Sequence, residues 1–164
     1  MTYDGLTLTG YYPGSIGRVV ETHAVYYHEH WGFDVSFESQ VARELGEFMG
    51  RFDTGKDGFW TVRAEDRFLG AIAIDGANLD NEGARLRWFI VSKDCQGKGI
   101  GKILMDAALD FCRTVGHNRV YLWTFRGLDP ARRLYENAGF TLDQEHDVTQ
   151  WGGRIVEQKF VLTM

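Results

Sequence analysis

The 164-residue sequence has little cysteine, no long apolar run and no dense stretch of positive charge. Its two cysteines, Cys95 and Cys112, are too few for a disulfide framework and lack the spacing of zinc ligands, so we expect reduced thiols in a cytoplasmic protein. No stretch approaches the ~20 apolar residues of a membrane-spanning helix, and residues 1–5 have neither the basic nor the apolar part of a signal peptide. We therefore expect neither a secreted disulfide-rich protein nor a membrane protein.

Basic residues are fewer than acidic ones, 18 against 23, and the formal net charge is −5. A nucleic-acid-binding protein relies on basic patches that neutralise phosphates, and none stands out in this sequence. The acidic balance mildly favours a partner that carries a cationic or amine group.

Proline- or serine-rich linkers, internal repeats and low-complexity tracts are also absent, so we predict a single domain over residues 1–164. Hydrophobic residues make up 44% of the chain, which is enough for a packed core. Alternating or short apolar runs predict strands, and apolar residues at helical spacing predict helices. We expect strands over 6–11, 59–64, 68–74, 84–92, 120–125, 140–145 and 155–162, and helices over 15–31 and 36–52 and after positions 100 and 129.

This order, β-α-α-β-β-β-α-β-α-β-β, predicts an α+β fold with a mixed, mostly antiparallel central sheet flanked by helices. Turns that contain glycine or charged residues separate the strands at 59–64, 68–74 and 84–92, which favours an antiparallel meander. In the second helix an apolar stripe follows Ser36, which we expect to cap the helix.

Three glycines at alternate positions, Gly97, Gly99 and Gly101, lie between a predicted strand and a predicted helix. Glycine has no Cβ, so backbone N–H groups in such a turn can approach a phosphate closely, and the helix adds the positive end of its dipole. The spacing is not the Gly-x-Gly-x-x-Gly of a Rossmann nucleotide site, and Ile103 follows Lys102 where a P-loop needs Ser or Thr. The residues predict a site for a pyrophosphate-like group, with a purely structural strand–helix corner as the alternative.

Two motifs at the expected separation resemble the GNAT superfamily of acetyl-coenzyme A-dependent N-acetyltransferases. The first is Gln96-Gly97-Lys98-Gly99-Ile100-Gly101, which is similar to the family's Gln/Arg-x-x-Gly-x-Gly/Ala signature. The second is the run 131–140, which resembles the family's helix with a tyrosine followed by Gly-Phe. The resemblance covers about residues 58–164, and the N-terminal helices are more loosely similar to the acetyltransferase half of MarR-fused members.

The resemblance implies a GNAT-like fold, acetyl-coenzyme A (acetyl-CoA) as co-substrate and no metal. It implies that the backbone of Phe89, Ile90 and Val91 holds the pantetheine arm and orients the thioester. It also implies that the turn binds the pyrophosphate through Gln96, Gly97, Lys98, Gly99, Ile100, Gly101 and Lys102. Tyr135 is similar in position to the family's general acid, which protonates the departing thiolate. The alternative for Tyr135 is a plain core residue.

The chain departs from the family's pattern in the strand before the turn. Where many relatives carry a glutamate base, this chain has Arg85, and Arg87 lies two residues further on the same strand face. The two arginines suggest substrate binding to an acceptor that bears a carboxylate or a phosphate, although two solvated arginines would fit equally well. Leu128 also stands near a position where many relatives have an asparagine.

A substitute for the missing glutamate is expected in the N-terminal helices. We nominate Glu38 as the catalytic base, with His28, Glu29 and His30 as further candidates. A spacing of two directs His28 and His30 to different faces of a helix, which argues against a metal site. Cys95 is not expected to act as an acyl-cysteine nucleophile, because the family transfers the acetyl group directly and no histidine is near it in sequence.

The leading hypothesis is an N-acetyltransferase that moves the acetyl group of acetyl-CoA directly to a primary amine of a small molecule, such as an anionic amine or an amino acid, or to an amino terminus. The alternative is a non-catalytic acyl-CoA sensor or regulatory module on the same fold. The arginine in place of the glutamate favours the alternative, and Tyr135 argues against it. A homodimer is left open, and neither nucleic acid nor a membrane is expected as a partner.

Overall fold

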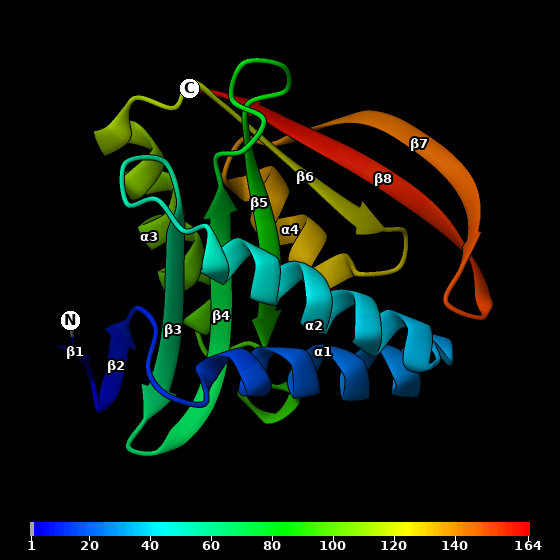
Figure 1. The fold of residues 1–164 in the computed structure, drawn as a ribbon, viewed down its shortest axis with the longest axis horizontal. Coiled ribbons are helices and arrows are strands. Elements are labelled where there is room, and N and C mark those ends of the chain that lie inside the picture. The colour runs from blue at the N-terminus through cyan, green and yellow to red at the C-terminus, as the bar shows by residue number, and fades with distance from the viewer. Residues whose placement is uncertain (1) are drawn as a thin grey trace.

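The computed structural model describes residues 2–164, with side chains from Asp4 onward. The described chain forms one sheet of eight strands with helices against both faces (Figure 1). The strands are β1 (Thr2–Tyr3), β2 (Leu6–Thr9), β3 (Gly58–Ala64), β4 (Arg67–Asp75), β5 (Ala84–Val91), β6 (Arg119–Phe125), β7 (Thr141–Gln150) and β8 (Gly153–Thr163). The helices are α1 (Ser15–Trp31), α2 (Val35–Gly50), α3 (Ile100–Val115) and α4 (Asp129–Asn137), and a 3-10 turn, Lys93–Cys95, leads from β5 toward α3.

The strand order across the sheet is β1-β2-β3-β4-β5-β6-β8-β7, and within the described chain β5 and β6 form its one parallel pair. This arrangement confirms the predicted α+β fold, including the antiparallel meander of β3, β4 and β5. The parallel pair is short, because β5 and β6 are in register only at Ala84 with Val120 and at Arg85 with Tyr121. Beyond these positions the two strands diverge, as Figure 1 shows. The backbone of the second half of β5 therefore has no strand partner on its β6 side.

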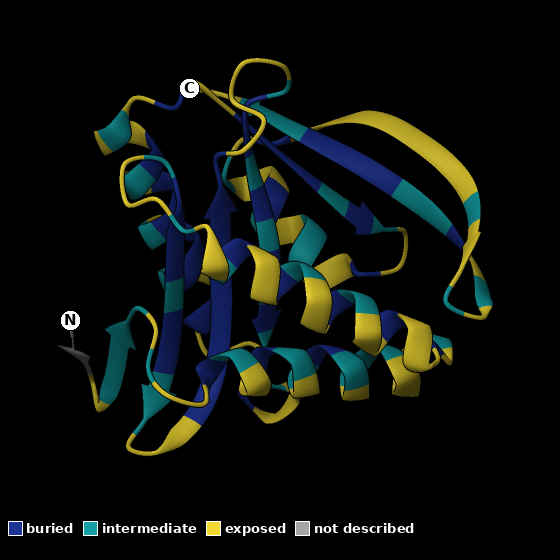
Figure 2. Cartoon of the chain, in the orientation of Figure 1, coloured by how far each residue is buried: buried dark blue, intermediate teal, exposed yellow. Residues whose placement is uncertain are grey.

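Two apolar cores lie on the two faces of the sheet, and the buried strands β4 and β5 separate them (Figure 2). On one face Val19 of α1 and Leu45 of α2 pack in the same cluster as Trp88 of β5. On the other face Leu104 of α3 packs in the same cluster as Leu86 of β5. Full burial of one such side chain stabilises the fold by about 1.5–3 kcal/mol. The cores fix the sheet between the two helical layers.

A β-bulge in β5 changes which side chains face α2. The pairing of β4 with β5 shifts between Ala71 and Ala73, so that Trp88 and Phe89 lie opposite one residue of β4. Trp88 has a φ of 46°, in the left-handed region that a bulky residue rarely adopts. As a result Arg87 and Trp88 share the α2 face although they are adjacent in sequence. The guanidinium carbon of Arg87 lies 4.1 Å from the centroid of the Trp88 ring.

The structure differs from the expected elements in several details. β7 continues to Gln150 and is exposed along almost its whole length, so its polar sequence carries no apolar alternation (Figure 2). Asp34 caps α2 in place of Ser36, because its carboxylate accepts a hydrogen bond from the Ser36 amide. β2 ends at Thr9, and β1 is an additional edge strand. Among the helices described, none is both long and apolar enough to cross a membrane.

Candidate active site

A cleft lies where β5 has separated from β6, and α3 and α4 complete its walls. Its lining combines residues 89–91 of β5, the turn residues Gln96 and Gly97, Gly101 of α3 and several positions between Leu128 and Tyr135. The structure therefore brings these predicted cofactor residues together with the predicted acid. Four other residues expected at this site do not line the cleft: Lys98, Gly99, Ile100 and Lys102.

The glycine-rich turn has the backbone geometry of an anion cradle. Gly97 and Gly99 have φ values of 78° and 83°. A Cβ at either position would meet no atom within 4 Å, so glycine is required for the path of the backbone and not for space. Gly99 is the N-cap of α3, and among the described residues no side chain caps this end and its first turn holds no acidic residue. The first amides of α3 are therefore available to an anion.

Three residues at the start of α3 serve packing and surface pairing. A Cβ at Gly101 would lie 2.8 Å from Cδ1 of Leu134, so the missing side chain lets α3 approach α4. Ile100 is buried in the core beneath α3. Lys102 is exposed, and its Nζ lies 2.7 Å from Oδ2 of Asp106. The backbone of the turn, more than its side chains, thus shapes this end of the cleft.

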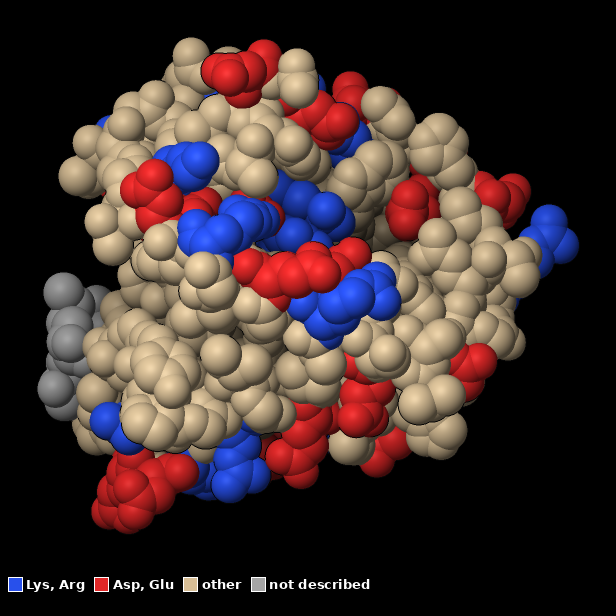
Figure 3. All heavy atoms as spheres, in the orientation of Figure 1, with Lys and Arg blue, Asp and Glu red and all other residues tan. Residues whose placement is uncertain are grey.

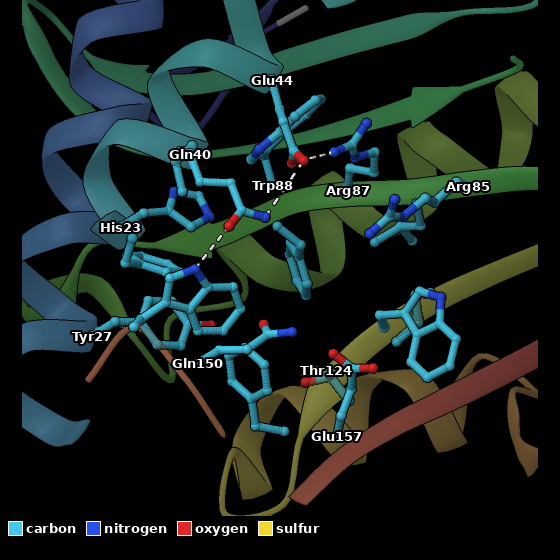
Figure 4. Close-up of a pocket in the computed structure, with 18 of the residues that line it drawn as sticks. His23, Tyr27, Gln40, Glu44, Arg85, Arg87, Trp88, Thr124, Gln150 and Glu157 are labelled. Atoms are coloured by element: carbon cyan, nitrogen blue, oxygen red, sulfur yellow. Dashed lines mark hydrogen bonds and ion pairs between the residues drawn. The ribbon is translucent and has the colours of Figure 1, made fainter. Parts of the chain in front are cut away.

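A second cavity, of about 330 Å³, lies on the α1 and α2 side of the sheet (Figure 4). Its size is typical of a small-molecule site. Aromatic side chains from α2, β5, β6 and the turn after β7 form much of its wall. The ionisable side chains that line it include His23, Glu44, Arg85, Arg87 and Glu157. Figure 3 shows basic and acidic side chains next to one another around a hollow in this face of the molecule.

The cleft and the cavity meet at Tyr27, Phe89 and Tyr135, which line both spaces. Tyr135 is 5% exposed, and its ring centroid lies 6.0 Å from that of Phe89. Burial raises the pKa of the Tyr135 hydroxyl above its ordinary value, so the group stays protonated at neutral pH. A proton donor is therefore placed where a group bound in the cleft would meet a group bound in the cavity.

Arg87 is held by two carboxylates and is not a free group in the cavity. Its Nη2 lies 2.8 Å from Oε2 of Glu44, and its Nη1 lies 3.0 Å from Oδ2 of Asp75. Arg51 also pairs with Asp75 at 2.8 Å. Burial alone would raise the pKa of Asp75, but hydrogen bonds from Arg51, from the Ala77 amide and from Arg87 outweigh it and hold this pKa below its ordinary value.

The same network continues to the tip of the β7–β8 hairpin. Gln40 Nε2 donates to Oε1 of Glu44 at 3.4 Å, and Gln40 Oε1 accepts a hydrogen bond from Trp151 Nε1 at 2.8 Å (Figure 4). Trp151 lies in the turn between β7 and β8, with a φ of 54°. These contacts join the hairpin tip to α2 and enclose one side of the cavity.

Arg85 lies on the same strand face as Arg87 but has no such partners. Among residues 4–164 its side chain forms no hydrogen bond or ion pair, and its Nε is buried without a hydrogen-bond partner. Burial, and then the charge of Arg87, hold the pKa of Arg85 below its ordinary value. An unpaired guanidinium that faces a cavity is a donor for a carboxylate or a phosphate.

The residues nominated as bases lie outside the cavity. Glu38 is exposed and lines a groove between α1 and α2 on the outer surface of the molecule. Glu29 pairs with Lys93 at 3.6 Å. His28 and His30 use Nδ1 for contacts of 2.9 and 2.8 Å with backbone carbonyls. None of the four lines the space that contains Tyr135.

The two cysteines are buried free thiols. Burial, and then the nearby Asp94, raise the pKa of Cys95. Burial also raises the pKa of Cys112, to about 12. A raised pKa keeps the unreactive thiol form, so neither side chain is suited to be a nucleophile.

Sequence reasoning missed several residues of the cavity, among them His23 and Glu157. His23 is 6% exposed, its Nδ1 lies 2.8 Å from the Val19 carbonyl oxygen, and burial lowers its pKa to about 4. The neutral ring thus donates from Nδ1 and leaves Nε2 as an acceptor. Glu157 lies within the last predicted strand. Neither residue stands in a motif, so no local pattern distinguishes it from a surface residue.

Comparisons with known proteins identify the family of the chain. The sequence model of the acetyltransferase (GNAT) family matches residues 19–140. An uncharacterized N-acetyltransferase of Methanocaldococcus jannaschii is 25% identical over 138 residues, which are 82% of this chain and 60% of that protein. The N-acetylaspartate synthetase of Xenopus tropicalis is 33% identical over 82 residues, 50% of this chain and 30% of that protein. The chain thus spans 60% or less of these relatives' own lengths.

A solved structure shares the fold over nearly its whole length. The spermidine N-acetyltransferase of Vibrio cholerae, in complex with CoA and spermine, matches with a TM-score of 0.73 at 20% identity. The match covers 98% of this chain and 96% of that one. At this identity the likeness shows the fold.

Proposed function

Because this chain belongs to the GNAT family of acetyltransferases, we propose that it transfers the acetyl group of acetyl-CoA directly to the primary amine of a small molecule that also bears an anionic group. The observation that carries the proposal is the junction at Tyr135. There a cleft with an uncapped helix N-terminus meets a cavity with an unpaired arginine.

The cleft fits acetyl-CoA by the donors that it offers. The amides at the start of α3 would bind the pyrophosphate, which the helix dipole favours. Residues 89–91 of β5 have no strand partner on the β6 side. Their backbone groups that point to that side are available to the amides of the pantetheine arm, apart from the Val91 carbonyl oxygen, which accepts a hydrogen bond from Gln96 Nε2 at 3.3 Å. Each such hydrogen bond contributes about 0.5–1.5 kcal/mol.

When bound, acetyl-CoA supplies a thioester carbonyl that a neutral amine can attack. A backbone N–H of β5 near Val91 would stabilise the negative charge that develops on the carbonyl oxygen, an effect of about 3 kcal/mol. The Tyr135 hydroxyl, which burial keeps protonated, would give its proton to the departing sulfur. Burial at the junction excludes water from both groups.

The acceptor's anionic group is assigned to Arg85. Arg87 already pairs with Glu44 and Asp75, so of the two predicted arginines only Arg85 has its donors free in the described chain. A charge-assisted hydrogen bond of this type contributes about 1.5–3 kcal/mol. The name of the Xenopus relative implies an anionic amine, aspartate, as acceptor, and an arginine would repel a polycation such as the spermine bound by the Vibrio protein.

The alternative is an acyl-CoA sensor without catalysis, because no glutamate stands at Arg85. A release assay for the CoA thiol separates the two with a panel of amino acids, their decarboxylated amines and polyamines. We expect release with the amino acids and little with the polyamines. Tight binding of acetyl-CoA without release for any amine would favour the sensor.

A further inference from the structure

Glu157 of β8 carries a carboxylate and lines the cavity on the α1 and α2 side of the sheet, which we call the acceptor cavity (Figure 4). Ile155, two residues earlier on the same strand, belongs to the core beneath α1 and α2, so the alternation along β8 directs Glu157 to the same side. Within the part of the chain that the structure describes, Glu157 forms no ion pair or side-chain hydrogen bond. Figure 4 shows Glu157 and Arg85 reaching the same cavity from two different strands, and they do not pair with each other.

Other ionisable groups line this cavity or lie next to Glu157 on the sheet. Those that line it with Glu157 are His23, Tyr27, Glu44, Arg85, Arg87 and Tyr135. Two more flank Glu157 on the sheet: His146 is its cross-strand neighbour in β7, and Lys159 lies two residues further along β8. Lys159 Nζ lies 3.0 Å from Glu82, and His146 Nε2 lies 3.2 Å from the side-chain oxygen of Gln144. The carboxylate of Glu157 is therefore left to a ligand.

Three groups in the cavity could accept a proton from an amine, and two of them are poorly suited. Glu44 has one oxygen on Arg87 and the other on Gln40. His23 is held uncharged, because burial lowers its pKa to about 4, so it offers no countercharge to an ammonium group. Glu157 remains, because both of its oxygens are free in the described structure and it faces the cavity that reaches Tyr135.

The rest of the cavity indicates what else the ligand carries. Its walls include Phe37, Trp88, Trp123, Phe125 and Trp151, which offer apolar surface. Burial of an apolar group against such walls is favourable by about 25 cal/mol for each Å² removed from water. A ligand that fits has an anionic group, an ammonium group and an apolar side chain.

We propose that Glu157 binds the ammonium group of the acceptor and takes its proton while Arg85 holds its carboxylate, so that the acceptor is a zwitterionic amino acid with an apolar side chain. This inference rests on the proposed function and adds to it the base and the class of acceptor. None of the four residues nominated as bases lines this cavity.

Glu157 takes one proton from the ammonium group, and the freed lone pair forms the carbon–nitrogen bond at the acetyl carbon as the carbon–sulfur bond breaks. The sulfur leaves with that electron pair and takes the proton of Tyr135. The second nitrogen proton restores the Tyr135 hydroxyl through water, and Glu157 releases its proton to solvent.

The first test measures binding by calorimetry on the protein saturated with CoA, so that no turnover occurs. The probes are L-phenylalanine, 2-phenylethylamine, which lacks the carboxylate, and 3-phenylpropanoate, which lacks the ammonium group. Wild type should bind L-phenylalanine about tenfold or more tightly than either analogue. Glu157→Gln should weaken the binding of L-phenylalanine and 2-phenylethylamine but not of 3-phenylpropanoate. Arg85→Met should weaken the binding of L-phenylalanine and 3-phenylpropanoate but not of 2-phenylethylamine. Asp147→Asn, on the exposed strand β7, is the control and should bind all three as wild type does.

The second test is kinetic. Glu157→Gln should lower kcat about 100-fold or more, with acetyl-CoA affinity unchanged as proof of folding. The loss should shrink as the pH rises above ~8, because the amine then loses its proton to water without a base. A merely structural role for Glu157 would not give this pH-dependent recovery.

The outcomes separate the two proposals. If wild type acetylates amino acids and Glu157→Gln matches it in affinity and pH profile, the assignment of Glu157 is wrong and the proposed function stands. If wild type acetylates only amines without a carboxylate, the acceptor class is wrong. If the three probes bind with the expected dependence on Arg85 and Glu157 but no amine is acetylated, the acceptor site stands and the proposed function fails. Failure of wild type to bind L-phenylalanine overturns the inference.

Discussion

Arg87 bridges two carboxylates from different elements, Glu44 of α2 at 2.8 Å and Asp75 of β4 at 3.0 Å, and its side chain is only 12% exposed. Arg85, two residues earlier, bridges nothing in the described chain. The two arginines look equivalent in the sequence, yet Arg87 joins α2 to β4 and Arg85 is available to a ligand.

The difference predicts opposite effects on stability. Arg87→Met should lower the free energy of unfolding by about 2 kcal/mol, because it leaves Glu44 and part of Asp75 unpaired in a poorly solvated place. Arg85→Met removes an unpaired, partly buried charge, so its free energy of unfolding should stay equal or rise. Urea unfolding of both variants checks this. Equal destabilisation by the two substitutions would contradict it.

The buried His23 predicts a dependence of stability on pH. Its pKa is about 4 in the folded protein, because of burial, against 6.5 ordinarily. Between these values the unfolded chain binds the proton and the folded protein does not, so stability falls as the pH falls below about 6.5. From pH 7 to pH 5 this loss is about 2 kcal/mol.

The check is a comparison with His23→Asn, whose amide can still donate to the Val19 carbonyl. Urea unfolding at pH 7 and pH 5 should show that wild type loses about 2 kcal/mol more than the variant. The same difference between wild type and variant at both pH values would mean that His23 is not held neutral by the fold.

Much of the fold could be predicted, because its elements are marked by local patterns. The apolar stripe that starts at Phe37 and the run that starts at Ile100 have helical spacing, and Gly97 and Gly99 mark the turn before α3. The second half of β7 could not be predicted, because its residues are exposed and polar. Without a buried face, a strand leaves no alternation in the sequence.

The cofactor cleft was more predictable than the acceptor cavity for a physical reason. A short run such as 96–101 fixes the turn by its own backbone. In contrast, Arg87 pairs with Glu44, which lies 43 residues away in the sequence, and only tertiary packing sets that contact. On α2, Glu38 and Glu44 flank the same apolar stripe on its two sides, and the stripe does not reveal which side borders the cavity. The structure places Glu44 there and leaves Glu38 on the outer surface.

The glycine turn predicts a matched pair of variants at the two ends of α3. Gly99 and Gly116 both have left-handed φ values, 83° and 86°, and a Cβ at either would meet no atom within 4 Å. Gly99→Asp and Gly116→Asp therefore introduce the same charge and similar backbone strain, of about 1–2 kcal/mol. Only Gly99 adjoins the amides assigned to the pyrophosphate.

Calorimetry with acetyl-CoA should show that Gly99→Asp weakens binding about tenfold or more, through repulsion of the pyrophosphate. Gly116→Asp should bind acetyl-CoA as wild type does. Equal affinities for the two variants, both shown to be folded, would contradict the assignment of the pyrophosphate to the start of α3.

Tyr135 lines both the cleft and the cavity. Tyr135→Phe keeps the ring and its contact with Phe89, so the affinity for acetyl-CoA should stay within about twofold while kcat falls about 100-fold, because only the transition state needs the proton. A general acid acts only while it is protonated. Burial raises the pKa of Tyr135, so its hydroxyl stays protonated, and wild-type kcat should show no loss from this group up to about pH 10.

Tyr121→Phe is the matched control, because Tyr121 is equally buried, lines neither space and accepts a hydrogen bond from Asn78 at 3.3 Å. It should cost about 1 kcal/mol of stability and leave kcat unchanged. The comparison needs a substrate for which chemistry limits the rate, shown by a pre-steady-state measurement without a burst of CoA release. If Tyr135→Phe then keeps the wild-type kcat, the hydroxyl is not the acid, and Tyr135 serves the core alone through its contacts with Phe89, Phe140 and Phe160.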